Sequence, residues 1–471
     1  MSSELAFESI FSGIVLGGFT LLFTNIPWFN TTPKKLLRYA MGVVMFLYGY
    51  QSVNHEGPVF SNDAIVLGIL MGVLALVFYS SQLQTSFWKK FYGIVPTVLL
   101  CYFIPALLHW PSNLISGEES QLYFVSSRYL LPACLVLLCI SIDFKGIINL
   151  GPKALIMFFT ATLGIIIGGP VALIIALSFF PDLFTATPLD IANGLSTIAG
   201  SWIGGGANQT AMKEIFEVQD NLFASMIVVD VLVANIWMGF LLYGANISTK
   251  VDKWFQSDTS AIEDLKKRVE DYRASVEKIP TSIDTITVLA VAFVATGIAH
   301  MGADNILPFM ENFREGLEKA GLNSLLSGFF WLIVIATTIG VGLSFSPARK
   351  LEGVGASRFG TLFIFVLVAT IGMKMNILEV FKNPGLFAIG FIWMLIHVGL
   401  LLAVGKLIKA PFFFVAVGSQ ANVGGAASAP VVASAFSPAL APVGVLLAVL
   451  GYALGTYGAL ICAILMQQVA G

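Results

Sequence analysis

The sequence predicts an all-α protein that crosses a membrane many times, and three observations lead to this prediction. Hydrophobic residue types make up 57% of the 471 residues and charged types only 11%, whereas a soluble domain carries roughly 25% charged residues. The apolar residues gather in runs of about 18 to 25, the length that spans a bilayer as a helix. Two further apolar segments are interrupted by clustered glycines, which do not suit a straight helix facing lipid.

Twelve uninterrupted runs are expected to be membrane-spanning helices, and the first is expected to be retained because it lacks a basic flank and a cleavage site. In chain order the runs cover residues 5–24, 36–54, 63–80, 91–109, 128–143, 153–180, 221–244, 285–303, 324–345, 358–376, 385–405 and 440–467. The two interrupted segments cover residues 190–216 and 410–432. Non-helical backbone at membrane depth must be buried in protein or line a wet cavity.

The distribution of Lys and Arg predicts how the interrupted segments enter the membrane. If both are re-entrant hairpins and the N-terminus is outside, 19 of the 25 basic residues lie on the inner side. If both cross fully, the two sides carry 12 and 13. Because loops on the cytoplasmic side carry an excess of basic residues, we expect two hairpins.

Sequence landmarks recur in the two halves of the chain. The motif G-x-x-A-N stands at residues 204–208 and again at 418–422. Two helix starts also match: Arg128-Tyr129 with Arg358-Phe359, and Gly151-Pro152 with Asn383-Pro384. We therefore expect two copies of one unit, each with five spans and one hairpin. An odd number of spans inverts the second copy in the membrane, as in secondary transporters built from inverted repeats.

The predicted organisation has four parts. Residues 1–62 form two additional N-terminal helices, and residues 63–244 form the first repeat with hairpin 190–216. Residues 245–284 form a charged cytoplasmic helical linker, in which apolar residues recur at helical spacing between charged ones. Residues 285–471 form the second, inverted repeat with hairpin 410–432.

The motif Gly204-x-x-Ala207-Asn208, its extension Gln209-Thr210-Ala211-Met212 and its second copy ending at Asn422 resemble the YjcL-like family of integral membrane proteins, whose function is unknown. More distantly, the two-hairpin inverted plan is similar to the sodium-coupled glutamate and citrate symporters and the cation/proton antiporters. This second resemblance implies a homodimer in which a moving core carries substrate past a scaffold in an elevator-like motion. The sequence departs from these families in two ways. No span carries paired aspartates, and the second half lacks an arginine in the core to hold a substrate carboxylate.

Polar side chains gather at both predicted hairpin tips. Opposed half-helices point free N–H groups toward anions and free carbonyl groups toward cations. Glycine lets the backbone approach a ligand closely, and amide side chains supply both donors and acceptors. The alternative is that these amides satisfy broken backbone inside a rigid core. The predicted substrate-binding residues are Ser201, Gly205, Asn208, Gln209, Ser419, Gln420 and Asn422.

Asp230 is the residue that most clearly suggests ion coupling, because it stands inside an apolar run directly after the first hairpin. A carboxylate at membrane depth is costly and must be paired, protonated or bound to a metal ion. We expect Asp230 to bind Na⁺ or carry a proton, with Asn235 and Thr197 contributing. A structural hydrogen bond from Asp230 to the hairpin is the alternative. His397 also lies mid-span and could relay protons, although a satisfied buried histidine is the simpler interpretation.

These features predict an ion-coupled secondary transporter of a small anionic or zwitterionic organic solute, such as an amino acid, a peptide or a carboxylate. The coupling ion is expected to be Na⁺, and a proton or cation antiporter is the alternative. We expect no enzyme activity and no cofactor, because the apolar runs contain no nucleophile–base or metal-binding motif. A net charge of −2 also gives no basic field for nucleic acid. The expected location is the cell membrane, the inner membrane of a bacterium.

Overall fold

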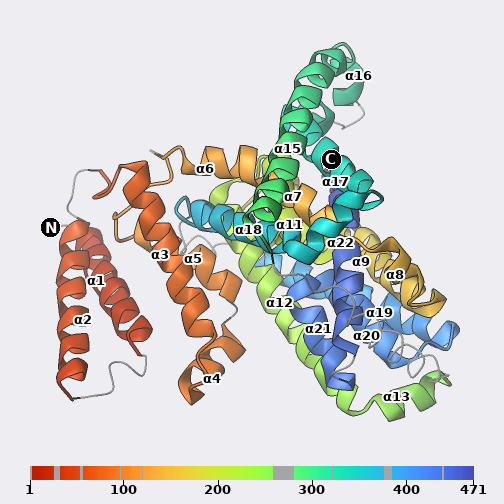
Figure 1. The fold of residues 1–471 in the computed structure, drawn as a ribbon, viewed down its shortest axis with the longest axis horizontal. Helices are drawn as coiled ribbons and strands as arrows, with labels where there is room; N and C mark the ends of the chain where they lie inside the picture. Colours follow the sequence, from red (N-terminus) through yellow and green to blue (C-terminus); the bar gives the residue numbers. More distant parts are fainter. Residues whose placement is uncertain are drawn as a thin grey trace. The chain divides into compact units, whose positions relative to one another are not determined.

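The computed structural model describes residues 3–25, 32–53, 57–95, 97–118, 120–257, 280–319, 323–375, 384–437 and 440–471. These residues form helices joined by short turns (Figure 1). Their β-structure is limited to a single isolated bridge between Phe60 and Ile115. The predicted all-α class is therefore confirmed for the described part of the chain.

Eight helical segments within the described residues are long and apolar enough to cross a membrane, or nine if a bent pair counts as one span. They are Ala6–Phe23, Asp63–Ser81, Leu122–Ile140, Pro152–Phe179, Asp220–Asn246, Ser282–Glu311, Gly385–Leu407 and Val443–Ala470. The bent pair is α17 (Gly328–Ser344) with η5 (Pro347–Val354), which are inclined by 94°. The chain is thus a multi-pass membrane protein. The layout with twelve spans stays a prediction.

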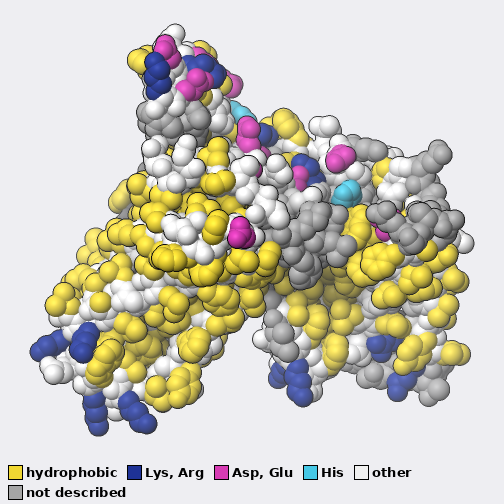
Figure 2. Space-filling view, turned by 180° about the vertical axis from the view of Figure 1, so that it is seen from behind, with side chains coloured by type: hydrophobic (Ala, Val, Ile, Leu, Met, Phe, Trp, Pro, Cys, Tyr) yellow, Lys and Arg dark blue, Asp and Glu magenta, His cyan; other side chains and the backbone are white. Residues whose placement is uncertain are grey.

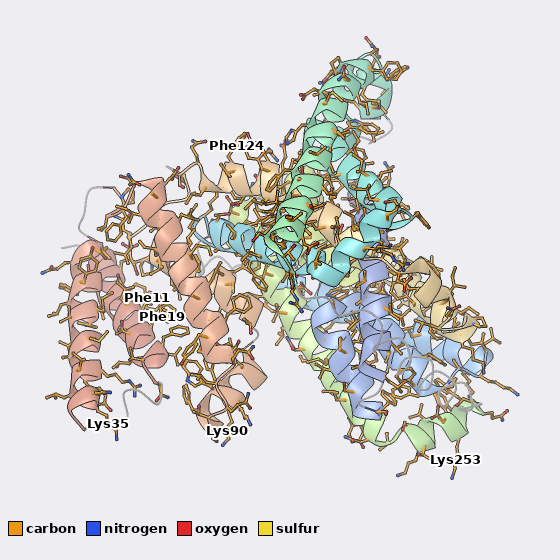
Figure 3. All side chains as sticks on the ribbon, viewed as in Figure 1. Phe11, Phe19, Lys35, Lys90, Phe124 and Lys253 are labelled. Atoms are coloured by element: carbon orange, nitrogen blue, oxygen red, sulfur yellow. The ribbon has the colours of Figure 1, made fainter. Side chains whose placement is uncertain are left out.

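The chain divides into two compact units, residues 1–128 with 365–380, and residues 129–364 with 381–471. This division does not test the predicted repeat boundaries, which stay predictions. Helices of the first unit are α1 (Ser3–Phe23), α2 (Thr32–Ser52), α3 (Asp63–Ser81), α4 (Ser86–Ile94), α5 (Thr97–His109) and α6 (Leu122–Val125). The expected span 91–109 is divided between α4 and α5. Lys35 and Lys90 lie at the same end of this unit (Figure 3), as expected if both belong to the inner side.

The second unit contains the predicted hairpins. Its further helices are α7 (Leu131–Ile140), α8 (Phe144–Ile148), α9 (Pro152–Phe179), α10 (Pro188–Gly204), α11 (Gly206–Ile215), α12 (Asp220–Asn246), α13 (Ser248–Phe255), α15 (Ser282–Glu311), α16 (Arg314–Lys319), α19 (Gly385–Leu407), α20 (Phe412–Val423), α21 (Gly425–Phe436) and α22 (Ala441–Ala470). The helix α18 (Ala356–Gly372) contains a boundary between the two units. Residues 258–279 of the expected helical linker lie outside the described residues.

Hydrophobic side chains cover the flank of the second unit in Figure 2. Basic side chains gather at one end of this flank, and α16 carries charges of both signs at the other end. Lys253 marks the basic end in Figure 3. An apolar belt between charged ends is the surface that a membrane-embedded helical protein presents to lipid.

Small residues allow the helices of the second unit to pack closely. A Cβ on Gly455 would lie 2.4 Å from the Cα of Gly204, and one on Gly168 would lie 2.7 Å from the Trp393 ring. These glycines belong to small-residue stretches of α22 and α9. Helix association in lipid depends on such close approach, because no hydrophobic effect acts between the helices there.

Both interrupted segments break at glycine. Gly205 has φ +77° between α10 and α11, and Gly425 has φ +59° at the start of α21. L-residues rarely adopt such values. At the first break the chain folds back, because a Cβ on Gly200 would lie only 2.6 Å from the carbonyl oxygen of Asn208. The ends of α10 and α11 at Leu189 and Ile215 also line one cavity.

Candidate functional site

The first broken pair consists of the helices α10 and α11, and the second of α20 and α21. Asp230 of α12 is hydrogen-bonded to both helices of the first broken pair. Its Oδ2 accepts hydrogen bonds from Ser201 Oγ at 2.6 Å and Gln209 Nε2 at 3.0 Å, and its Oδ1 accepts from Trp202 Nε1 at 2.7 Å. Ser201 and Trp202 belong to α10, whereas Gln209 belongs to α11. The Asp230 side chain is buried, with 7% of the residue exposed. One carboxylate therefore fastens the two arms to α12.

The donors around Asp230 determine which ligands it can take. No described Lys or Arg forms an ion pair with Asp230, so three hydrogen bonds offset the cost of burying its charge. Trp202 Nε1 and Gln209 Nε2 can only donate, but the Ser201 hydroxyl can also accept. If that hydroxyl turns, Asp230 Oδ2 and Ser201 Oγ become two neighbouring oxygen acceptors. Such a pair suits either a proton or a hard cation such as Na⁺.

Asn208 lies at the tip of the first pair and uses its whole amide within the protein. Its Nδ2 donates to the carbonyl oxygens of Gly204 and Tyr452, each at 3.0 Å. Its Oδ1 accepts from Thr456 Oγ1 at 2.6 Å. Because Tyr452 and Thr456 are one turn apart on α22, Asn208 fastens this tip to α22.

Asn422 makes the same three kinds of contact in the second pair. Its Nδ2 donates to the carbonyl oxygens of Gly418 at 3.0 Å and Phe158 at 3.2 Å. Its Oδ1 accepts from Thr162 Oγ1 at 2.8 Å. Phe158 and Thr162 are again one turn apart, here on α9. Each asparagine thus bonds the carbonyl four residues before it and a carbonyl–threonine pair on a long helix from the other half of the chain.

The two breaks meet beside α22. A Cβ on Gly451 would lie 2.5 Å from the carbonyl oxygen of Ile203 and 3.8 Å from that of Ala421. These carbonyls lie near the C-terminal ends of α10 and α20. By contrast, added Cβ atoms on Gly206 and Gly425 would meet nothing closer than 3.9 Å. The backbone at the start of α21 therefore has open space beside it, and the start of α11 is in ordinary van der Waals contact with its surroundings.

Ser419 lies in a neutral network in the second pair. Its Oγ accepts from Trp237 Nε1 at 2.8 Å and lies 2.8 Å from His397 Nε2. His397 Nδ1 lies 3.1 Å from the carbonyl oxygen of Ala161. A carbonyl can only accept, so Nδ1 carries the proton and Nε2 accepts from the Ser419 hydroxyl. Both ring nitrogens are satisfied by a neutral imidazole, which agrees with the simpler interpretation of His397.

Gln420 is buried, with 1% exposed. Its Nε2 donates to Ser428 Oγ at 2.7 Å across the second break. Its Oε1 is buried and has no hydrogen-bond partner among the described residues. A buried acceptor without a donor is costly, so Gln420 can take a proton donor or a cation.

Two predicted ion-coupling residues, Asn235 and Thr197, form hydrogen bonds with groups other than Asp230. Asn235 Nδ2 donates to the carbonyl oxygen of Val231 at 2.7 Å, and Thr197 Oγ1 donates to that of Gly194 at 2.7 Å. Both bonds lie within the residue's own helix, as is common for polar side chains in membrane helices. The structure thus joins Ser201 and Gln209 to Asp230, but gives Asn235 and Thr197 local partners.

Five residues that contribute side chains to these contacts were not predicted from the sequence: Trp202, Thr162, Thr456, Trp237 and Ser428. The signal for the threonines was weak. Both stand beside the small-residue stretches of α9 and α22, which indicate close packing without specifying a partner. Trp202 directly follows Ser201, so a search for donors next to the G-x-x-A-N motif would have included it.

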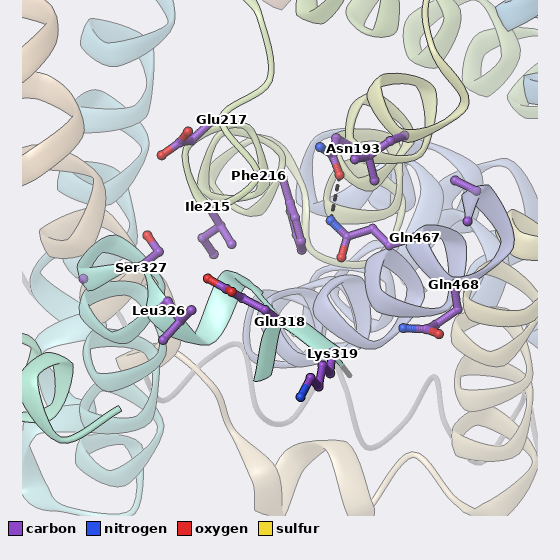
Figure 4. A pocket seen from close by; sticks show the side chains of 14 residues that line it. Asn193, Ile215, Phe216, Glu217, Glu318, Lys319, Leu326, Ser327, Gln467 and Gln468 are labelled. Atoms are coloured by element: carbon purple, nitrogen blue, oxygen red, sulfur yellow. Dashed lines mark hydrogen bonds between the residues drawn. The ribbon is translucent and has the colours of Figure 1, made fainter. Parts of the chain in front are cut away.

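An open cavity of about 790 Å³ lies where the ends of α10, α11 and α22 come together (Figure 4). Its wall includes the hydrogen bond from Gln467 Nε2 to Asn193 Oδ1, which is 2.8 Å long and joins α22 to α10. Glu217, Glu318 and Lys319 give it charges of both signs. The cavity leads from the surface to the base of the first broken pair.

These features define the chain as a multi-pass helical membrane protein with two broken helix pairs that are fastened in the same way. Comparison with known sequences then gives its family. The chain belongs to the family described as "Protein of unknown function (DUF819)", whose characteristic sequence matches residues 68–469. It is similar to the "Uncharacterized membrane protein YjcL" of Bacillus subtilis (strain 168), with 25% identity over 343 residues, 72% of this chain and 82% of that protein. The predicted resemblance to YjcL-like membrane proteins is confirmed.

Proposed function

We propose that this protein is an ion-coupled secondary transporter of a small anionic or zwitterionic solute. The observation that carries the proposal is the matched fastening of Asn208 and Asn422, which ties each broken pair to a helix from the other half. Matched discontinuous helices that meet at one place are the usual construction of a substrate site in transporters with inverted repeats. On this proposal the broken pairs are re-entrant hairpins within two inverted repeats of five spans.

The contacts favour movement of the hairpins as one body. Asn208 and Asn422 have no spare amide protons, and both side chains are fully buried. Opening one tip alone would leave buried donors and acceptors unsatisfied, at about 1–3 kcal/mol each. A core that moves as a unit retains these bonds. This supports an elevator-type motion, with a second copy of the chain in the membrane as scaffold partner.

The proposed solute site lies at the starts of α11 and α21, where Gly425 has open space beside it. The N–H groups at the starts of α11 and α21 suit an anionic group such as a carboxylate. Gln420 Oε1 supplies an acceptor for an ammonium group or a cation. An amino acid, a peptide or a carboxylate fits this combination.

The proposed coupling site is Asp230 with Ser201, and Na⁺ is the proposed ion. A proton or cation antiporter is the second candidate, because the Ser201 hydroxyl can turn to accept a proton shared with Asp230. The two candidates differ in what binding of the ion requires. Na⁺ needs further oxygen ligands beside Asp230 Oδ2, whereas a proton needs only the Ser201 oxygen.

Uptake into proteoliposomes tests the proposal. The purified chain is reconstituted, and uptake of amino acids, dipeptides and carboxylates is measured under a Na⁺ gradient, a proton gradient or neither. We expect one solute class to accumulate under the Na⁺ gradient, and Asp230→Asn to abolish the accumulation. Asp304→Asn, a matched change at an exposed aspartate, should leave it intact. Solute-independent Na⁺ or proton flux would favour the antiporter, and gradient-independent equilibration would refute coupling.

A further inference from the structure

A second cavity of about 480 Å³ lies where α17 ends and η5 begins. It is lined by Ile148, Asn149, Ser344, Phe345, Ser346, Pro347, Arg349 and Lys350. All of these residues belong to the second unit. The proposed solute and coupling sites share none of them.

The bend between α17 and η5 would place this cavity at a membrane surface. The two helices are inclined by 94°, so η5 runs along the membrane plane if α17 crosses the membrane. Phe345 and Ile148 are 70% and 66% exposed. Such large apolar groups beside basic residues are typical of the interface between acyl chains and headgroups. The basic residues of this segment are also those that the distribution of Lys and Arg predicts on the inner side.

An ion pair fixes one wall of the cavity. Arg349 Nη1 lies 2.7 Å from Asp143 Oδ1, which ties η5 to the start of α8. Asp143 therefore balances the charge of Arg349. Lys350 forms no ion pair with a described residue, and it leaves the cavity with a net positive charge. Ser344, Ser346 and Asn149 add polar groups around it.

We propose that this cavity binds the phosphate headgroup of an anionic phospholipid, with Lys350 contacting the phosphate and the acyl chains lying against Phe345 and Ile148. The phosphate chemistry would also suit a soluble phosphate anion. The exposed apolar side chains favour the lipid, because a soluble anion gains nothing from them. Basic pockets between membrane helices on the cytoplasmic side bind anionic headgroups in the same way. This inference does not depend on transport activity.

The test is thermal melting of the full chain in detergent, titrated with dioleoylphosphatidylglycerol, dioleoylphosphatidylcholine or glycerol 3-phosphate. We expect only the phosphatidylglycerol to raise the melting temperature at low concentration, because a ligand that binds the folded state stabilises it. Lys350→Gln should weaken the apparent affinity about fivefold, the effect of one basic residue near an anionic lipid surface. Lys350→Arg should retain it.

Lys253→Gln is the matched control, since it removes the same charge from an exposed lysine outside the cavity. An equal loss of affinity in Lys253→Gln would overturn a localised site. Stabilisation by glycerol 3-phosphate alone would overturn the lipid assignment. Unchanged affinity in Lys350→Gln would overturn the role of Lys350. If Lys350→Gln does not fold, the same comparison between Lys350→Arg and Phe345→Ser tests the acyl-chain contact, which should weaken only in Phe345→Ser.

Discussion

The two broken helix pairs share their fastening but differ in charge. Asn208 and Asn422 make equivalent bonds, each to a threonine and a carbonyl one turn apart. Beside the first pair lies the carboxylate of Asp230, held by three donors. Beside the second lies a neutral network of Ser419, His397 and Trp237. The comparison separates two tasks: the shared contacts hold both broken pairs in place, and the unshared carboxylate is where we propose that ion coupling takes place.

The largest expected effect comes from Asp230→Ala, which removes the acceptor for three donors. Ser201, Trp202 and Gln209 would then be left without their shared partner, at about 1–3 kcal/mol for each buried group. We expect loss of ion-dependent transport and a destabilisation of several kcal/mol by these figures, seen in thermal or denaturant melting. Asp230→Asn, which keeps an acceptor oxygen, should fold better and still lose coupling. Ion-dependent transport retained in Asp230→Asn would show that the carboxylate beside the first broken pair does not carry ion coupling.

Asn208→Ala and Asn422→Ala should have similar, smaller effects. Each variant removes the acceptor of one buried threonine hydroxyl, while the Tyr452 and Phe158 carbonyls keep the backbone bonds of α22 and α9, and the expected cost is about 1–3 kcal/mol. Melting of the two variants, and of the double-mutant cycles with Thr456→Val and Thr162→Val, measures both fastenings. Coupling energies of the same sign and size would sharpen the equivalence. A large energy at one tip with none at the other would break it.

Ser419→Ala should cost less and leave ion dependence intact. The change removes the acceptor for Trp237 and the donor for His397, both neutral, at about 1 kcal/mol for such bonds. We expect a lower melting temperature and an unchanged response to Na⁺ and pH. The matched change in the first pair is Ser201→Ala, which should alter the ion response. If Ser419→Ala alters it as well, ion chemistry would extend to the second half.

The smallest effect is expected for Asn235→Ala. Asn235 is exposed and bonds only the carbonyl of Val231 in its own helix. Surface changes away from special features stay within about 0.5 kcal/mol. Melting and uptake should match the parent protein, and a loss of Na⁺ dependence would return Asn235 to the coupling site.

The sequence predicted the helical elements well because each depends on local composition. Helices α9, α12 and α19 begin and end within three residues of the expected spans. Glycine clusters also marked both breaks, since a positive φ at Gly205 and Gly425 favours that residue. The order in which the helices cross the membrane and the inversion of the repeats depend on contacts between distant helices and on the bilayer, so both remain proposals.

The candidate site was predicted in part. Gln209 and Ser201 were predicted because they flank the glycines of the first break. Asp230 was predicted because a carboxylate among apolar residues is costly. Helical spacing alone could not show that Asn235 bonds its own helix. Nor could it identify Trp202 as a partner of Asp230, because that contact depends on how α10 packs on α12. Side-chain partners between distant helices are fixed by tertiary packing, which local pattern does not contain.

Thermal stabilisation of the purified protein by ions tests the central claim most directly. The melting temperature is measured across Na⁺ and K⁺ concentrations and pH for the parent protein, Asp230→Asn and Ser419→Ala. We predict that Na⁺ stabilises the parent protein and Ser419→Ala by mass action, and that this response vanishes in Asp230→Asn. A response to pH alone, absent in Asp230→Asn, would make the proton the coupling ion. A Na⁺ response that survives in Asp230→Asn would contradict the assignment of ion coupling to the first broken pair.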